Sequence, residues 1–316
     1  MPLDEIAKRL LELAAAAGGQ PTHLQTPAEA RAVMLAQSAS LGPPEEVASI
    51  EDRTIATKEK GDEIPIRIYR PQRSGVLPGL VYFHGGGWVL GSIDTHDGLC
   101  RSIANAAECV VVSVDYRLAP EHPFPAGASD TFFALAWVVF NAESLGIDPW
   151  RVVVGGDSAG GNLAAVATLM AREYGGRPAL AGQVLLYPIT DCDFNTSSYL
   201  NYGDGHLLTR DAMAWFFKHY LPADIWADDP FISPLRAESL RGLPPALVIT
   251  AECDPLCDEG NAYARRLEAD GVPVRWHCYP GMIHGFIRRH KLLPPGREAL
   301  NEIAAMLNGL TSHRTR

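Results

Sequence analysis

Residues 155–162 read Gly-Gly-Asp-Ser-Ala-Gly-Gly-Asn, and the rest of the chain is organised around this turn. The β-branched run at 152–154 comes before it, and the helix-compatible residues 163–172 come after it. A sharp turn between a strand and a helix lifts a serine hydroxyl to the carboxyl edge of a sheet, and glycines two residues to either side leave room for neighbouring backbone. The turn therefore predicts Ser158 as a nucleophile. The alternative is an ordinary turn, because Gly-x-Ser-x-Gly alone is a common pattern.

Outward from this turn, short apolar runs alternate with helical stretches. The runs are residues 80–83, 110–114, 152–154, 184–187, 246–250 and 274–279. Such continuous runs are typical of strands buried on both faces of a mostly parallel sheet that helices cover on each side. Residues 49–58 and 63–69 alternate apolar and polar positions around the turn-like Glu59-Lys60-Gly61, which favours an antiparallel hairpin at the sheet edge. The predicted fold class is α/β, with about eight strands.

Two stretches do not follow this alternation. They are the alanine-rich, helical residues 1–45 and the loop-and-helix residues 191–229. We expect both to form a helical cap over the carboxyl edge of the sheet, with residues 46–316 as the main domain that contains the second cap segment. Trp88, Leu207 and Phe216 are candidates for the pocket wall, although aromatic residues at helical spacing more often belong to a core.

A second glycine-rich segment, His84-Gly-Gly-Gly-Trp88, directly follows the run at 80–83. Three consecutive glycines lose much chain entropy on folding, so the backbone there is expected to approach another group closely. A loop of this kind supplies a main-chain donor for a developing oxyanion, together with the amide of the residue after the nucleophile, here Ala159. The alternative is a flexible turn.

The carboxylate partner is expected after a later strand, because this arrangement uses the chain order serine, acid, histidine. Asp254 follows the run at 246–250 and precedes a proline placed to begin a helix. Glu252, Asp258 and Glu259 are nearby competitors, but the last two would be carried into that helix. Asp254 has a second interpretation as a helix cap.

The predicted base is His284, on the loop after the last apolar run. An imidazole there can reach back over Ser158. The rival is His277, which falls inside the strand at 274–279, where the pleat fixes its direction; we interpret it as a packed or surface residue.

Composition restricts the partners of the chain. A formal net charge of −10 and a pI near 5.5 oppose binding to phosphates, so no nucleic-acid partner is expected. Residues 1–13 mix charged and apolar positions at helical spacing, which predicts an amphipathic helix and not a signal peptide. No apolar run approaches the roughly 18 residues of a membrane span. These features predict a cytoplasmic protein without membrane insertion.

Six cysteines occur without CxxC spacing. Cys253 and Cys257, with His277 further along, make a zinc site conceivable, but tetrahedral sites usually have closer ligand pairs. Reduced cysteines that act as small apolar side chains are the favoured interpretation, and no metal is expected.

Four segments occur in a fixed order: His-Gly-Gly-Gly at 84–87, Gly-Asp-Ser-Ala-Gly-Gly at 156–161, Asp-Pro-Leu at 254–256 and His-Gly-Phe at 284–286. With Asp-Tyr-Arg-Leu-Ala-Pro-Glu at 115–121, they make the chain resemble the hormone-sensitive-lipase-like esterases, bacterial esterase family IV, in the subgroup with a Gly-Asp-Ser-Ala-Gly turn. The likeness spans about residues 45–310.

This resemblance implies an α/β-hydrolase fold, a Ser158, Asp254 and His284 triad, and an oxyanion hole made by Gly86, Gly87 and Ala159. It further implies a cofactor-free carboxylesterase that acts on small short- to medium-chain acyl esters and forms a homodimer. Two alternatives stay open. One is a non-catalytic small-molecule receptor, as the plant gibberellin receptors resemble this family but lack its histidine; the other is a deacetylase or lactonase that uses the same triad.

Overall fold

The computed structural model of the chain describes residues 3–57 and 63–310. Its centre is an eight-stranded sheet with the strand order β1-β2-β4-β3-β5-β6-β7-β8. The strands are β1 (Ser49–Ala56), β2 (Glu63–Arg70), β3 (Leu77–Phe83), β4 (Val110–Val114), β5 (Ile147–Asp157), β6 (Gly182–Leu186), β7 (Ala246–Cys253) and β8 (Val274–Ile283). All neighbours from β4 to β8 are parallel, while β2 is antiparallel to both β1 and β4. The predicted α/β fold with a mostly parallel sheet of about eight strands is confirmed.

The hairpin predicted at the sheet edge is formed by β1 and β2. Their register runs from Ser49 opposite Arg70 to Ala56 opposite Glu63. The expected turn at residues 59–61 lies outside the described residues.

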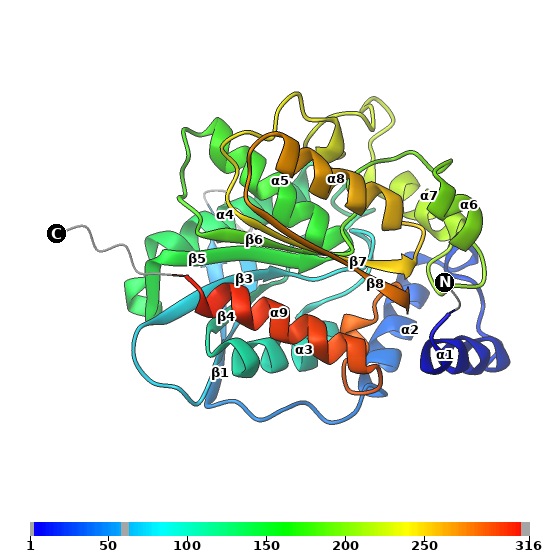
Figure 1. Ribbon diagram of the computed structural model, residues 1–316, viewed down its shortest axis with the longest axis horizontal. Helices are drawn as coiled ribbons and strands as arrows, with labels where there is room; N and C mark the ends of the chain where they lie inside the picture. Colours follow the sequence, from blue (N-terminus) through cyan, green and yellow to red (C-terminus); the bar gives the residue numbers. More distant parts are fainter. Residues whose placement is uncertain (1–2, 58–62, 311–316) are drawn as a thin grey trace.

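Helices cover the sheet on both faces (Figure 1). They are α1 (Glu5–Ala16), α2 (Pro27–Ala39), α3 (Ile93–Ala107), α4 (Ala126–Phe140), α5 (Ala159–Glu173), α6 (Ser197–Tyr202), α7 (Arg210–Tyr220), α8 (Cys257–Ala269) and α9 (Pro294–Asn308). Side chains alternate between the faces along each strand. Val81 and Val154 therefore join the core under α4, α5 and α8, whereas Leu80 and Val153 join the core under α3 and α9.

Four helices, α1, α2, α6 and α7, gather at the end of the sheet to which the arrows of β7 and β8 point (Figure 1). Their starts are set by local capping. Asp4 accepts hydrogen bonds from two amides of the first turn of α1, and Thr26 and Glu29 form a capping box before Pro27 in α2. The amphipathic helix expected at residues 1–13 is thus observed as α1, beginning and ending later than predicted. Within residues 3–57 and 63–310, no helix has the length and apolar character needed to cross a bilayer.

Candidate active site

Ser158 lies at the junction between β5, which ends at Asp157, and α5, which begins at Ala159. Its backbone has φ +57° and ψ −119°, a left-handed conformation that is uncommon for a residue with a side chain. The junction is held against the next strand, because the Ser158 amide donates to the carbonyl of Leu186 at 2.8 Å. Ser158 is therefore fixed at the carboxyl edge of the sheet in a strained turn.

Glycine flanks the serine because no larger residue fits. A Cβ atom at Gly160 would lie 1.9 Å from the Phe83 carbonyl oxygen, and one at Gly156 would lie 2.4 Å from the same atom. Contacts this short are impossible without moving the backbone. The turn after β5 and the end of β3 thus pack main chain against main chain, as the glycine spacing predicted.

Asp254 and His284 reach Ser158 from the two neighbouring strands β7 and β8. Asp254 directly follows β7 and is fully buried, and His284 directly follows β8. The Nδ1 atom of His284 lies 2.7 Å from Asp254 Oδ2, and its Nε2 atom lies 3.1 Å from Ser158 Oγ. Carboxylate, imidazole and hydroxyl, far apart in the sequence, thus form one continuous hydrogen-bonded row.

The structure does not give Asp254 the helix-cap role that the sequence left open, because Leu256 is the N-cap of α8 and no side chain caps that helix. The second oxygen of Asp254, Oδ1, accepts the amide of Leu256 at 3.0 Å, ahead of α8. This local turn holds the Asp254 side chain while its other oxygen contacts His284.

The competitors of Asp254 and His284 have partners elsewhere. Glu252 accepts the amide of Gly281, Asp258 accepts the amide of Ser198, and Glu259 accepts the amide of Thr190. His277 is half exposed on β8, where its Nδ1 lies 2.7 Å from Glu302 Oε1.

The glycine loop after β3 faces the turn at Ser158, between β5 and α5. Gly86 and Gly87 have φ +128° and +59°. A Cβ atom at Gly86 would meet the Leu90 carbonyl at 2.3 Å, and one at Gly87 would meet the Phe216 ring at 2.2 Å. In the described part of the chain no hydrogen bond is donated by the amides of these two glycines, and Ala159 is the first residue of α5, where amides lack an intrahelical acceptor. These three amides have the character that an oxyanion hole requires.

Asp157 links the loop to the nucleophile turn, a role that the sequence analysis missed although the residue adjoins Ser158. Its Oδ1 accepts the Tyr82 hydroxyl at 2.7 Å and the Gly85 amide at 2.9 Å, and His96 Nε2 lies 3.3 Å away. Burial acts to raise the pKa of this carboxyl, but the hydrogen bonds of His96 and Tyr82 and the charge of Arg288 hold the pKa below its usual range. An ionised carboxylate thus fixes Gly85 and with it the start of the loop.

Ser158 and His284 open into a pocket of about 400 Å³. Its walls come from the first 45 residues, the glycine loop, the segment around α7 and the residues after His284. Leu207 and Phe216 line it, as expected. Trp88 does not: its side chain is 1% exposed and its ring stacks on Tyr220 at 4.2 Å. The structure therefore differs from the expectation for Trp88, because the turn after Gly87 directs the indole into the core.

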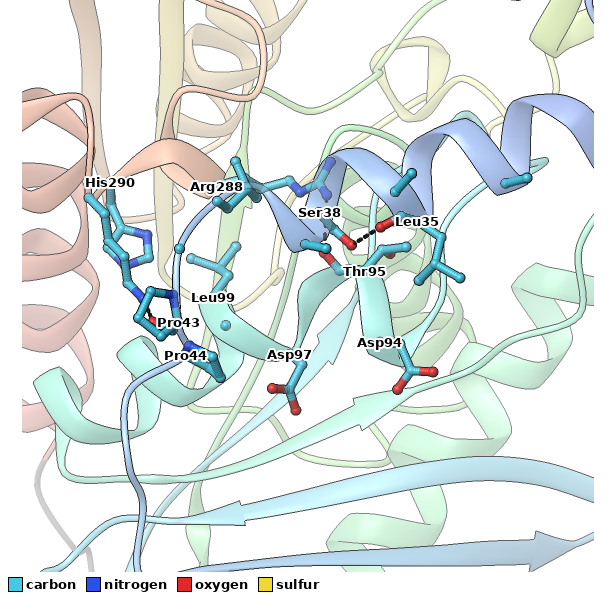
Figure 2. A pocket seen from close by; sticks show the side chains of 17 residues that line it. Leu35, Ser38, Pro43, Pro44, Asp94, Thr95, Asp97, Leu99, Arg288 and His290 are labelled. Atoms are coloured by element: carbon cyan, nitrogen blue, oxygen red, sulfur yellow. Dashed lines mark hydrogen bonds between the residues drawn. The ribbon is translucent and has the colours of Figure 1, made fainter.

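A second pocket of about 760 Å³, drawn in Figure 2, lies between the end of α2 and the start of α3. It contains neither Ser158 nor His284. Its size alone therefore does not make it the reaction site.

The zinc site left open by the sequence finds no support in the geometry. Within the described ranges, no group of three or more histidine, cysteine, aspartate or glutamate side chains is placed to hold a metal ion. His277 bonds to Glu302, and Cys257 Sγ instead lies 3.7 Å from Cys278 Sγ.

The sheet is mostly parallel, with Ser158 in the turn after β5, Asp254 after β7 and His284 after β8. This arrangement defines the α/β-hydrolase class, and comparison with known proteins agrees. Residues 80–288 match the family described as the α/β hydrolase fold, and the chain belongs to that family. The resemblance to hormone-sensitive-lipase-like esterases is thereby confirmed at the level of the family.

Individual relatives cover most of the chain. It is 46% identical to the carboxylic ester hydrolase LipN of Mycobacterium tuberculosis over 80% of this chain and 68% of that protein. It is 41% identical to an ethyl acetate hydrolase of Pseudomonas putida over 89% of both. Among solved structures, the hyperthermophilic esterase from the archaeon Pyrobaculum calidifontis superposes with a TM-score of 0.92 at 44% identity, covering 98% of this chain and 99% of that one.

Proposed function

We propose that this chain is a serine carboxylic-ester hydrolase that acts on small esters of short- to medium-chain acids, with Ser158, His284 and Asp254 as its triad. The observation that carries the proposal is the hydrogen-bonded row from Asp254 through His284 to Ser158, with distances of 2.7 Å and 3.1 Å. The relatives named as ester hydrolases support the reaction type.

The proposed reaction has two steps. His284 Nε2 takes the proton of Ser158 Oγ as that oxygen attacks the ester carbonyl, and then gives the proton to the leaving alcohol. An acyl-enzyme remains. His284 next takes a proton from water as that water attacks the acyl-enzyme, and returns the proton to Ser158 Oγ when the bond to the acyl group breaks and the acid leaves. Asp254 holds the imidazole by Nδ1 and stabilises the imidazolium formed in each step.

The amides of Gly86, Gly87 and Ala159 form the proposed oxyanion hole. They would donate to the carbonyl oxygen when it becomes negatively charged in the tetrahedral intermediate. Removal of one such donor typically costs about 3 kcal/mol of transition-state stabilisation. Because the loop is fixed by Asp157 and by glycines that admit no side chain, its donors need little reorganisation during the reaction.

Replacement of the nucleophile tests the proposal. We expect Ser158→Ala to lower kcat for p-nitrophenyl butyrate by at least about 10⁴-fold, since serine removal in a comparable triad costs about 10⁶-fold. The control is Ser144→Ala, at an exposed serine outside the pocket, which should retain wild-type rates. Unchanged hydrolysis by Ser158→Ala would refute the proposal.

Covalent labelling separates the enzyme from a receptor on the same fold. An activated serine reacts with a fluorophosphonate probe, whereas a binding protein without one does not. We expect one labelled site, at Ser158, and no labelling of Ser158→Ala. A wild-type protein that binds esters but never labels would support the receptor alternative.

The acyl preference belongs to the same proposal and is tested by a panel. Linear p-nitrophenyl esters of increasing chain length, a lactone and an acetylated sugar should be compared by kcat/KM. We expect the highest values for the shorter linear esters, because the pocket of about 400 Å³ lies at the small end of ligand-binding cavities. A maximum for the lactone or the sugar acetate would instead favour the lactonase or deacetylase alternative.

The domain assignment, assembly and location also stay proposals. Residues 1–45 and 191–229 are proposed to form the cap of a main domain at 46–316, supported by the pocket-lining residues that each stretch contributes. A homodimer is tested by light scattering, and a cytoplasmic location by fractionation of the native host.

A further inference from the structure

The catalytic pocket has an unusual balance of charge for this protein. The whole chain carries a formal net charge of −10. The pocket that contains Ser158 and His284, however, is lined by two arginines, Arg288 and Arg289. Among its described lining residues, Asp157 is the one carboxylate. That carboxylate already accepts from Tyr82 and Gly85, so it is committed to holding the glycine loop.

Arg289 contacts the residue that follows His284, the proposed catalytic base. Its Nη1 atom donates to the carbonyl of Gly285, the residue after His284, at 3.2 Å. Within residues 3–57 and 63–310 it forms no ion pair with a carboxylate. Burial and the adjacent Arg288 lower the pKa of Arg289 to about 10, so it stays charged at neutral pH at an energetic cost.

Arg288 extends the same positive region. Its Nη2 donates to the Thr95 carbonyl at 3.0 Å, but its Nε is buried and has no hydrogen-bond partner among the described residues. Figure 2 shows Arg288 beside α2, with the carboxylates of Asp94 and Asp97 directed away from it.

Those two carboxylates are occupied. Asp94 pairs with Arg67 at 2.8 Å, and Asp97 pairs with Arg101 at 2.7 Å. The charge of Arg288 acts on the ionised Asp157, whereas Arg289 forms no ion pair with a carboxylate among the described residues. The charges of Arg288 and Arg289 oppose each other, and a bound anion would offset that repulsion. Guanidinium groups match carboxylates in shape as well as charge, since the two form parallel hydrogen bonds.

We propose that Arg288 and Arg289 form an anion subsite of the catalytic pocket, and that the preferred substrates are esters that carry a free carboxylate. The carboxylate stands on the acyl side in half-esters of dicarboxylic acids and on the alcohol side in acylated hydroxy acids. This inference rests on the ester hydrolysis proposed above, because the subsite serves the same Ser158.

Matched pairs of anionic and neutral esters test the subsite. Monoethyl succinate against ethyl butyrate places the charge on the acyl side, and acetoxyacetate against propyl acetate places it on the alcohol side. The quantity compared is the kcat/KM for the anionic ester divided by the kcat/KM for its neutral partner. For at least one pair, Arg289→Gln should lower this ratio by about tenfold or more, mainly through KM. The reason is that a hydrogen bond to a charged group contributes about 1.5–3 kcal/mol. Arg289→Lys keeps the positive charge but loses the planar group that forms two parallel hydrogen bonds. Its ratio should therefore lie between those of the wild type and Arg289→Gln.

The control variant is Arg241→Gln. Arg241 is exposed and does not line the pocket, and its replacement changes the net charge by the same amount. Its ratios should equal those of the wild type. The pair whose ratio responds to Arg289 identifies the side of the ester that carries the anion. Ratios that Arg289→Gln leaves unchanged in both pairs would overturn the subsite, and if Ser158→Ala still abolishes hydrolysis, the proposed function would stand without it.

Two further measurements need no folded Arg289 variant. The wild-type KM for at least one of the two anionic esters should rise with ionic strength while that for its neutral partner stays constant, because salt screens the guanidinium groups. Calorimetric titration of Ser158→Ala with monoethyl succinate and with acetoxyacetate reports binding in the absence of chemistry. Salt-independent KM values, or no binding of either ester, would contradict the proposal whether or not the wild type is active.

Discussion

At the scale of single residues, Ser158, the proposed nucleophile, adopts a strained backbone conformation. Ser158 adopts φ +57° and ψ −119°, where an L side chain is unfavourable, and its amide is held by Leu186. Non-glycine residues in sparsely populated regions cost on the order of 1–3 kcal/mol each. The hydroxyl is thereby oriented before any substrate arrives.

This strain yields a comparison between two inactive variants. Glycine adopts positive φ readily, so the free energy of unfolding of Ser158→Gly should exceed that of Ser158→Ala by about 1 kcal/mol. Ser158→Gly should therefore unfold at the higher temperature. Alanine keeps the Cβ and therefore keeps the strain. Thermal unfolding followed by circular dichroism measures the difference, and a more stable alanine variant would show that the turn is not strained.

Sequence reasoning placed some residues well and others poorly, for physical reasons. Ser158, Asp254 and His284 each directly follow a strand, so a pattern of apolar runs was enough to place them at one edge of the sheet. Trp88 was wrongly expected in the pocket wall, because the left-handed backbone at Gly87 and Trp88 determines which way the indole points. That backbone conformation cannot be deduced from the residue types alone. The sequence did not indicate the proposed role of Arg289, because the lack of an ion-pair partner among the described residues is seen only in the structure.

At the scale of elements, Arg31 links α2 to the loops that follow β3 and β4. Arg31 donates through Nε to the Val89 carbonyl at 2.8 Å and through Nη2 to the Ala119 carbonyl at 2.9 Å. It also forms a two-pronged pair with Glu121. Residues of the same helix line the catalytic pocket, among them Met34.

Loss of Arg31 should therefore affect substrate binding more than chemistry. We expect Arg31→Ala to raise KM for p-nitrophenyl butyrate severalfold, because the pocket wall loosens, with a smaller change in kcat. Glu121→Gln keeps both carbonyl contacts and serves as the matched control, with a smaller rise in KM. Equal KM values for Arg31→Ala and the wild type would show that α2 is held by other contacts.

Strand boundaries show the limits of local pattern. The run at 152–154 predicted the centre of β5 but not its extent, because β5 begins at Ile147 and includes Pro149. β8 likewise continues to Ile283 through Pro280 and Gly281, since Ile283 still pairs with Cys253 after a register shift. Proline and glycine favour a break, and tertiary pairing with β7 outweighs that preference.

At the scale of the whole molecule, buried histidines couple stability to pH. His84 is fully buried and stacked on Tyr116 at 4.4 Å. Burial and the neighbouring His96 lower the pKa of His84 to about 4, from 6.5. Burial also lowers the pKa of His96. Between about pH 6.5 and 4, His84 therefore binds more protons in the unfolded chain than in the folded chain, so its contribution to the free energy of unfolding falls as the pH is lowered through this window.

Urea unfolding at intervals from pH 7 to pH 4 measures this dependence. The midpoint should move to lower urea concentration as the pH falls, and His84→Asn should show a shallower dependence because one of the linked groups is gone. A pH dependence of His84→Asn as steep as that of the wild type would contradict the assignment of His84 as a neutral, buried histidine.

The pocket that contains Ser158 combines reacting groups fixed by backbone contacts with a wall formed by separate stretches of chain. The nucleophile turn, the glycine loop and the acid are fixed by backbone contacts at the sheet edge, whereas much of the wall comes from residues between 14 and 37 and between 207 and 216. Libraries that randomise those two stretches can therefore alter which molecules are accepted while the reacting atoms keep their places. For directed evolution, this separation makes selectivity adjustable without rebuilding the catalyst.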